Sequence, residues 1–126
     1  MYGTWCIEGV ASGVWVDALP AEIQYYVTDS GAKFALVRDQ EQTDKLLTIR
    51  SEIPEIKKVI WWEPKGMSAP IYQDDPWIMG FGEVLELGRQ YEVEHPADFD
   101  ECIDRGKPAD ISSMYYTAGT TGAAKG

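Results

Sequence analysis

Residues 111–126 read ISSMYYTAGTTGAAKG. The first part, Ile111 to Tyr116, is apolar and aromatic enough to predict a short strand. The strand runs without a break into a loop that holds three glycines, three threonines and one lysine. In open α/β sheets, ligands bind beyond the carboxyl ends of the strands. This stretch therefore predicts an α/β fold and the place in it where a ligand site is to be sought.

The chain before this stretch alternates between strand and helix patterns. Runs rich in β-branched and aromatic residues predict earlier strands at residues 14–16, 34–37 and 58–62. The spacing of apolar residues predicts helices at residues 1–12, 20–30, 41–53, 81–91 and 96–103. Residues 63–78 contain three prolines and a glycine and are expected to form a loop. This alternation predicts fold class α/β, with a largely parallel sheet and helices on both faces.

Two of these helices, at residues 20–30 and 81–91, have further support from residues at their ends or from an apolar stripe. Pro20 suits a first helical position, and Gly31 suits the position just past a helix end. The stripes expected to be buried are Ile23, Tyr26 and Val27 in one helix, and Val84, Leu85 and Leu87 in another.

The composition disfavours some classes of partner. The formal net charge of -10 disfavours binding to nucleic acid and a purely electrostatic attachment to an anionic membrane. No apolar run reaches the length of roughly 18–20 residues that a membrane span needs. Cys6 and Cys102 stand far apart, and we expect two free thiols in a reducing compartment. We therefore expect a cytoplasmic protein, and peripheral association with a membrane stays open.

The glycine-rich loop has the composition of a polyphosphate cradle. Its glycines let the backbone turn tightly and approach a ligand, and successive backbone N–H groups in such a turn bind anions. The threonine hydroxyls add donors, and Lys125 adds a positive charge suited to phosphate. The Walker A pattern GxxxxGK[ST] does not fit, because two alanines separate Gly122 from Lys125 and Gly126 replaces the required Ser or Thr.

The same loop closely resembles the signature of the adenylate-forming superfamily, YTSGTTGxPKG. The matching positions are Tyr116, Thr117, Gly119, Thr120, Thr121, Gly122, Lys125 and Gly126. Ala118 stands where the family usually has Ser, which removes a hydroxyl, and Ala124 stands where it usually has Pro. Softer similarity to long-chain acyl-CoA synthetases runs through residues 20–33, 39–46 and 54–75. The resemblance therefore covers essentially the whole chain.

The resemblance implies an activity and a set of binding residues. Family members join a carboxylate to AMP from ATP and pass the acyl group to a thiol, usually that of coenzyme A. The resemblance also implies ATP and Mg²⁺ as cofactors, coenzyme A as co-substrate and a carboxylic acid, here a fatty acid, as substrate. The residues implied to bind the phosphates are Thr117, Ala118, Gly119, Thr120, Thr121, Gly122 and Lys125. Thr117 is also the implied contact for magnesium.

In members of the family, the other binding segments and the catalytic lysine follow this loop in the sequence. The resemblance thus implies no catalytic residue within these 126 residues. We expect residues 1–126 to be a single partial subdomain of an acyl-CoA synthetase, with residues 115–126 as its phosphate-binding loop, and to be inactive alone. Two alternatives stay open: a stand-alone α/β module that binds a nucleotide or phosphate without catalysis, and a structural fragment that needs further chain.

Other polar residues are given ordinary roles. His95 has no partner at metal-ligand spacing and is expected at the surface. The acidic pair Asp74-Asp75 and the acidic residues near Asp100 are expected to be solvated charges rather than a metal or acid–base site.

Overall fold

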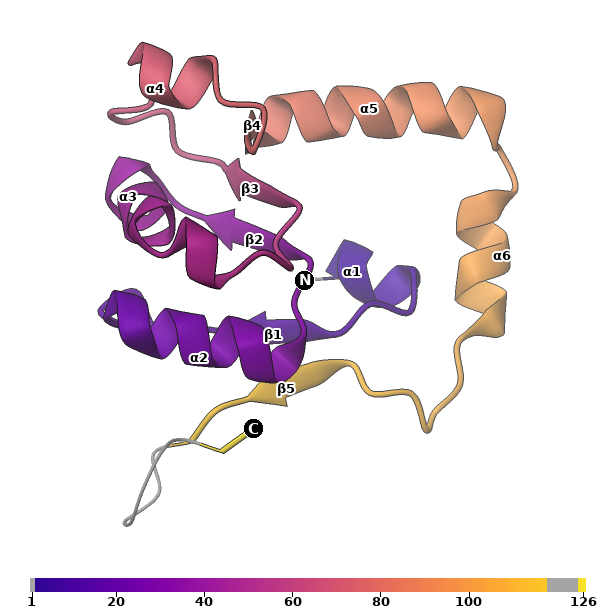
Figure 1. Cartoon of the computed structure of the whole chain (residues 1–126). Coiled ribbons are helices and arrows are strands. Elements are labelled where there is room, and N and C mark those ends of the chain that lie inside the picture. Colours follow the sequence, from indigo (N-terminus) through magenta and orange to yellow (C-terminus); the bar gives the residue numbers. More distant parts are fainter. Residues whose placement is uncertain (1, 118–124) are drawn as a thin grey trace. The chain divides into compact units, whose positions relative to one another are not determined.

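A computed structural model describes residues 2–117 and 125–126 (Figure 1). The chain divides into two compact units, unit 1 and unit 2. Unit 1 consists of residues 1–13 and 87–126, and unit 2 consists of residues 14–86.

Unit 2 is built around a parallel sheet of three strands. Its elements in chain order are α2 (Pro20–Ser30), β2 (Phe34–Val37), α3 (Gln40–Thr48), a 3-10 turn (Arg50–Glu52), β3 (Lys58–Trp61), α4 (Pro70–Gln73) and β4 (Ile78–Gly80). The strand order is β2-β3-β4, and both pairings are parallel. The register places Ala35 beside Val59, and Val59 beside Ile78. The predicted α/β class with a parallel sheet is confirmed.

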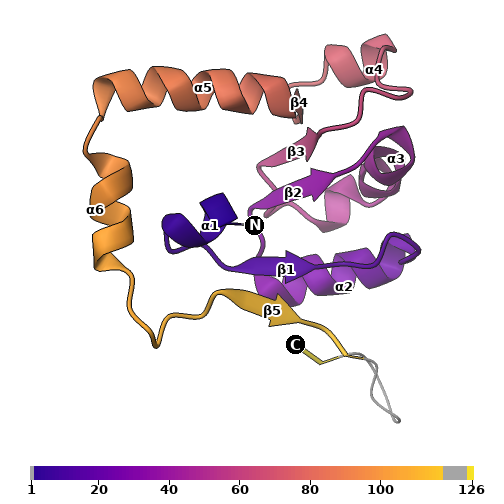
Figure 2. The same cartoon turned by 180° about the vertical axis from the view of Figure 1, so that it is seen from behind.

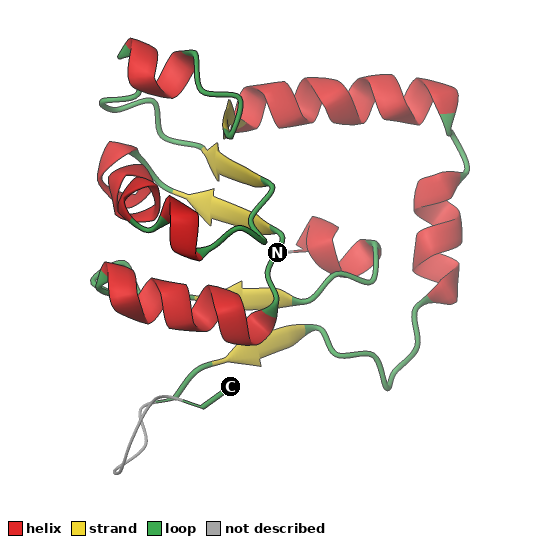
Figure 3. Ribbon diagram, viewed as in Figure 1, coloured by secondary structure: helices red, strands yellow, loops and turns green. Residues whose placement is uncertain are grey.

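Unit 1 holds a strand pair, β1 (Ala11–Gly13) and β5 (Ser113–Tyr115), which are also parallel. Its helices are α1 (Tyr2–Cys6) and α6 (Asp98–Arg105), and α5 (Phe81–Glu94) crosses from unit 2 into unit 1. Figure 3 shows the helices in red and the short strands in yellow. Cys6 and Cys102 are both free thiols.

Helix α2 shows how local sequence signals set an element. Pro20 is its first residue, and the Glu22 carboxylate accepts the N–H of Leu19 at 2.8 Å. Gly31 ends the helix in the left-handed conformation, with φ 64°, and donates its N–H to the carbonyl of Val27. This conformation costs a residue with a Cβ more than it costs glycine. The predicted helix, with both of its ends, is confirmed.

The core of unit 2 lies between helices α2 and α3 and one face of the sheet. Ile23 and Val27 from α2 are buried there, as predicted for the first stripe, and Tyr26 of that stripe packs half-buried against them. Leu46 from α3 is buried in the same place. From the sheet, Val59 and Ile78 are buried in the same cluster. Removing this apolar surface from water supplies the main favourable term in the folding of unit 2.

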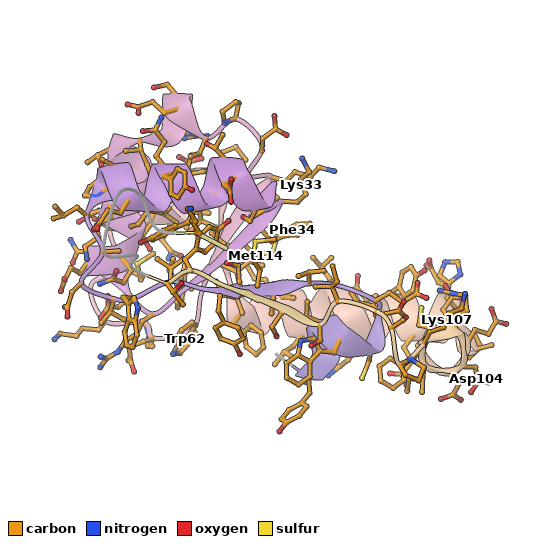
Figure 4. The ribbon with its side chains drawn as sticks, turned by 90° about the horizontal axis from the view of Figure 1, so that it is seen from below. Lys33, Phe34, Trp62, Asp104, Lys107 and Met114 are labelled. Carbon is orange, nitrogen blue, oxygen red and sulfur yellow. The ribbon has the colours of Figure 1, made fainter. Side chains whose placement is uncertain are left out.

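The two faces of β2 differ because successive residues of a strand point to opposite sides. Ala35 and Val37 pack against the buried cluster. Phe34 and Leu36, on the other side, are 58% and 57% exposed. Phe34 is labelled in Figure 4, beside Lys33. The described residues thus cover one face of β2 and leave an apolar pair on the other.

The first helix and the first strand were predicted in the wrong places. A helix over residues 1–12 is wrong, because α1 ends at Cys6 and Glu8 adopts φ 60°, outside the right-handed helical region. A strand at residues 14–16 is also wrong, because the strand is β1 at Ala11–Gly13. Within the part of the chain that the structure describes, the β-favouring residues Val14 to Val16 pair with no strand, whereas Ala11 to Gly13 lie opposite β5.

Two predictions further along the chain are also corrected. The expected loop at residues 63–78 contains helix α4 and the start of β4, which is held in register by β3. Helix α5 is present, but no residue of it is buried within the described structure, and Leu85 and Leu87 are 46% and 53% exposed. Val84 is half-buried. The apolar stripe of α5 was therefore predicted wrongly as buried.

Asp75 was predicted to be a solvated charge and is instead a fixed partner within unit 2. The Arg50 guanidinium donates to both of its carboxylate oxygens, at 2.6 and 3.3 Å, and the N–H of Trp77 donates at 2.9 Å. The same guanidinium lies 4.7 Å from the centre of the Trp77 ring. The Trp77 indole N–H donates to the carbonyl of Ile56 at 2.8 Å. These contacts tie the 3-10 turn to the segment that enters β4.

The first prediction concerns Gly66, which has φ 78°. A Cβ there would lie 2.1 Å from Oε1 and 2.8 Å from Cβ of Gln40, whose amide donates to the Tyr72 hydroxyl at 3.0 Å. Gly66→Ala should lower the free energy of unfolding by about 2–4 kcal/mol, from backbone strain and displacement of Gln40. Urea unfolding measures it. The control Gly88→Ala, in helix α5 with nothing within 4 Å, should be neutral or stabilising. Equal effects of the two substitutions would contradict the close approach at Gly66.

The second prediction concerns the pH dependence of stability at Asp75. Burial alone would raise the pKa of this carboxyl, but the N–H of Trp77, the hydrogen bond and charge of Arg50 and the charge of Lys58 outweigh it and lower the pKa. A carboxyl with a lowered folded-state pKa stabilises the fold above its unfolded pKa, and this stabilisation disappears as the pH falls through the folded value.

The stability advantage of the wild type over Asp75→Asn should therefore be constant between about pH 6 and pH 7 and should shrink below about pH 4. Thermal unfolding across this range measures it. Asp74→Asn, at the exposed neighbouring position, is the matched control and should show no such change. An advantage of the wild type that is the same at pH 3 and pH 7 would rule out the ionised partner.

Candidate functional site

The glycine-rich loop leaves from strand β5, which is held by strand β1 in unit 1. The parallel register pairs Ala11 with Ser113 and Gly13 with Tyr115. Figure 2 shows the two strands side by side. Immediately before β5, the carbonyl of Ser112 accepts two hydrogen bonds: the N–H of Ala11 at 3.0 Å and the indole N–H of Trp5 at 2.6 Å. Strand β5, which precedes the loop, is thus fixed at its start as well as along its length.

The two ends of the loop meet just beyond β5. Thr117 and Lys125 form an antiparallel pair. The N–H of Thr117 donates to the carbonyl of Lys125 at 3.1 Å, and the N–H of Lys125 donates to the carbonyl of Thr117 at 3.2 Å. Such a doubly hydrogen-bonded pair holds its two Cα atoms about 5.5 Å apart. The Thr117 hydroxyl and the Lys125 ammonium therefore belong to neighbouring residues in space.

The predicted site residues divide into two groups. Thr117 and Lys125 lie within the described structure, are brought together there and are both exposed. The predicted positions Ala118, Gly119, Thr120, Thr121 and Gly122 lie outside the described residues. The phosphate-binding role of these five positions stays a prediction.

The charge around Lys125 suits an anion. Within residues 2–117 and 125–126, no carboxylate forms an ion pair with the Lys125 ammonium. An exposed ammonium of this kind can pair with a phosphate group, and the threonine hydroxyl beside it can donate to the same group or bind a cation that accompanies it. The pair thus has the chemistry of one edge of a phosphate site.

A cation at this edge would have few protein ligands. In the part of the chain that the structure describes, no three His, Cys, Asp or Glu side chains gather as metal ligands would. Magnesium commonly takes most of its oxygens from water and substrate phosphates, with only one or two from protein. A single hydroxyl at Thr117 fits such a partial role.

One contact at the site is not evident from the sequence pattern. A Cβ added to Gly126 would lie 2.9 Å from Cε1 and 3.0 Å from Cζ of the Tyr116 ring. Gly126 therefore packs its backbone directly against this ring. The spacing of Tyr116 and Gly126 in the signature gives no hint that the two residues touch.

Two shallow cavities lie in a second region of unit 1. Their shared lining includes Glu8, Asp110 and Ile111. Glu8 lies 3.7 Å from the Arg105 guanidinium, and the Asp110 carboxylate accepts the N–H of Lys107 at 2.6 Å. Figure 4 labels Lys107 in this region. Two carboxylates already engaged in local contacts make these cavities unsuited to phosphate.

His95 and one acidic residue of α6 are engaged in local contacts. His95 stacks on Tyr91, with the ring centres 4.4 Å apart, and lies 3.9 Å from the carboxylate of Asp98. The Tyr91 hydroxyl donates to the same carboxylate at 2.6 Å, which accounts for one of the acidic residues of α6.

Within the described residues, none of the helices combines the length and the apolar character that a membrane crossing requires.

Comparison with known proteins gives one family and several relatives. The family model for the AMP-binding enzyme matches residues 1–126. The long-chain-fatty-acid–CoA ligase ACSBG1 of Rattus norvegicus is 32% identical over 98% of this chain, and its human counterpart is 30% identical over the same share. ACSBG2 of Xenopus laevis is 25% identical over 94% of the chain. The chain spans only 15–16% of the length of these relatives.

A solved structure supports the fold. The crystal structure of the anthranilate CoA ligase AuaEII in complex with anthranoyl-AMP matches with a TM-score of 0.61 and 19% sequence identity. The match covers 92% of this chain and 19% of that one. The α/β arrangement of the described residues is thus similar to part of an adenylate-forming enzyme.

A third prediction tests how β5 is anchored. Trp5→Phe keeps an aromatic ring but removes the N–H that donates to the Ser112 carbonyl at 2.6 Å. The substitution should lower the free energy of unfolding by about 1 kcal/mol, the net value of a hydrogen bond. The matched control is Trp15→Phe, at an exposed residue of unit 2, which should change it by less than about 0.5 kcal/mol. Denaturant unfolding measures both, and an unchanged stability for Trp5→Phe would show that the indole N–H does not anchor the strand.

Proposed function

Because this chain belongs to the AMP-binding enzyme family, we propose that the intact protein is an ATP-dependent acid–thiol ligase and that residues 115–126 form its phosphate-binding loop. The observation that carries the proposal is the pairing of Thr117 with Lys125. It brings a hydroxyl and an ammonium to the two ends of a glycine-rich loop. Both groups are suited to a polyphosphate, and both are exposed.

The proposed reaction has two steps. In the first, a carboxylate oxygen of the acid bonds to the α-phosphorus of ATP, and the bond to the bridging oxygen breaks, which releases pyrophosphate and leaves an acyl-adenylate. In the second, the thiol of coenzyme A gives up its proton and bonds to the acyl carbon, and AMP leaves. Negative charge shifts onto the departing pyrophosphate in the first step, so that positioned donors around it lower the barrier.

The residues of this chain are proposed to serve the first step only. The Lys125 ammonium would pair with the β- or γ-phosphate, and the loop from Thr117 to Gly122 would donate backbone N–H groups to the same phosphates. Magnesium bound with ATP would neutralise phosphate charge, and the Thr117 hydroxyl is the contact that this chain would offer it. Binding of the acid and transfer of its acyl group to the thiol would need groups outside residues 1–126.

We propose a fatty acid as the substrate. The support is the similarity along nearly the whole chain to long-chain-fatty-acid–CoA ligases. The solved structure with anthranoyl-AMP is only 19% identical in sequence to this chain. It therefore supports the fold and not the choice of acid. Coenzyme A is proposed as the thiol acceptor on the same grounds, and residues 1–126 are proposed as part of the nucleotide-binding domain of the intact enzyme.

The fourth prediction tests the loop in the intact protein. Lys125→Ala should lower kcat/KM for ATP by about 10²–10³-fold, the usual cost of removing one charge-stabilising donor from a reacting phosphate or oxyanion. Lys125→Arg keeps the charge in a different shape and should lose less. ATP-dependent formation of acyl-CoA from a long-chain fatty acid measures the effect.

Lys107→Ala is the control, because Lys107 is an exposed lysine of the same unit away from the loop ends. It should leave kcat/KM for ATP unchanged. If Lys125→Ala is as active as the wild type, the phosphate role of Lys125 is wrong. If the wild-type protein binds ATP but forms no adenylate with any carboxylic acid, a nucleotide-binding module replaces the ligase.

A further inference from the structure

A close contact between Tyr116 and Gly126 lies immediately outside the paired residues Thr117 and Lys125. Each partner of the contact is the sequence neighbour of one partner of the pair. A Cβ at Gly126 would lie 2.9 Å and 3.0 Å from two ring carbons of Tyr116, and 3.2 Å from Cγ of Met114. Non-bonded carbon atoms normally lie about 3.5–4.0 Å apart. The space that a side chain at position 126 would need is therefore already occupied by the ring.

The pair at the loop ends needs support of this kind. Thr117 and Lys125 are both exposed, so that water competes for their two backbone hydrogen bonds. An isolated two-stranded pairing in water is marginal without side-chain packing. The ring of Tyr116 supplies packing across the pair, because it lies on the strand that leads to Thr117 and touches the residue that follows Lys125.

The ring itself is held from the strand side. Tyr116 directly follows β5, and it is half-buried. Met114, labelled in Figure 4, also borders Gly126 and pairs in register with Ser12 of β1. The contact thus connects the returning end of the loop to a strand that is fixed by β1.

We propose that Tyr116 and Gly126 are positioning residues that hold the two ends of the phosphate-binding loop together and so place the Lys125 ammonium for ATP. The proposal rests on the proposed function for the identity of the ligand. Tyr116 acts through its ring, and Gly126 acts through the absence of a side chain. Neither residue is assigned a contact with a phosphate.

The test uses the intact protein and separates the Michaelis constants of the two substrates. Gly126→Ala forces the ring or the Lys125 backbone to move by roughly half an ångström, and it should raise KM for ATP about tenfold. The KM for the fatty acid should stay unchanged, because the contact concerns only the loop. Loss of folded protein would lower the apparent kcat and leave both KM values unchanged, so this readout distinguishes positioning from stability.

Variants at position 116 test the ring separately. Tyr116→Phe keeps the two ring carbons that face Gly126 and should stay within about twofold of the wild type in KM for ATP, whereas Tyr116→Leu removes them and should raise it about tenfold. A result in which Tyr116→Phe is as impaired as Tyr116→Leu overturns the role of the ring. A result in which Tyr116→Leu leaves KM for ATP unchanged overturns it as well.

A double-mutant cycle then links the two residues. With the ring removed, the methyl group of Gly126→Ala loses its two shortest contacts and keeps the one with Cγ of Met114 at 3.2 Å, so that Gly126→Ala in the Tyr116→Leu background should change KM for ATP by less than about twofold. Independent effects, in which the two changes multiply to about a hundredfold, would overturn the contact as their common cause. An unchanged KM for ATP in the single variant Gly126→Ala would overturn the proposal outright.

A readout without turnover keeps this proposal separate from the ligase assignment. Backbone amide exchange of the peptide that contains Thr117 and Lys125 should become faster in Gly126→Ala and in Tyr116→Leu, and it should be unaffected by Lys125→Ala. If Lys125→Ala retains full activity while exchange responds as expected, the phosphate role fails and the positioning contact stands. If exchange does not respond in either variant, the positioning contact fails whatever the outcome for Lys125.

Discussion

The parallel pairing of β5 with β1 is the constraint on which the candidate site depends. It joins residues about a hundred positions apart, since Ala11 lies beside Ser113. The carbonyl of Ser112 accepts N–H groups from both Ala11 and Trp5, so that the entry to β5 is fixed from two directions. Without this pairing, the position of Thr117 would not be fixed, and neither would the position in unit 1 of the pair that it forms with Lys125. The chemistry of the loop is local, but its position is set by contacts at the opposite end of the chain.

The sequence predicted best where a local signal coincides with a tertiary contact. Helix α2 was predicted with both ends because Pro20 and Gly31 carry their own conformational preferences, and because Ile23 and Val27 also reach the core. Strand β2 was predicted with the bounds that the structure has, although it leaves Phe34 and Leu36 exposed. In the site, the resemblance implied that Thr117 and Lys125 both bind phosphate, which stays a prediction, and the structure brings the two residues together in space.

The failures share a physical cause, which is that strand identity depends on a partner. Val14 to Val16 have high β propensity and pair with no strand among the described residues, whereas Ala11 to Gly13 have low propensity and pair with β5. Strand β4 is short and follows a proline-rich segment, and only its register with β3 reveals it. The contact of Tyr116 with Gly126 was missed for the same reason, because no periodicity records which backbone passes against which ring. The stripe of α5 shows the converse, since apolar spacing predicts a face but not what covers it.

The discontinuous make-up of unit 1 has a consequence for synthesis on the ribosome. Unit 2 is one continuous segment, residues 14–86, and its three strands are all present once Gly80 has been made. Strand β1 precedes it in the chain, but its partner among the described residues is complete only when Tyr115 is added, 29 residues after the end of unit 2 at residue 86 (115 − 86). At roughly 5–20 residues per second, this leaves β1 unpaired for a further ~1.5–6 s. The order of translation thus separates the formation of the two sheets in time, and the strand that fixes the loop is exposed to wrong partners for longer than any other in the chain that the structure describes.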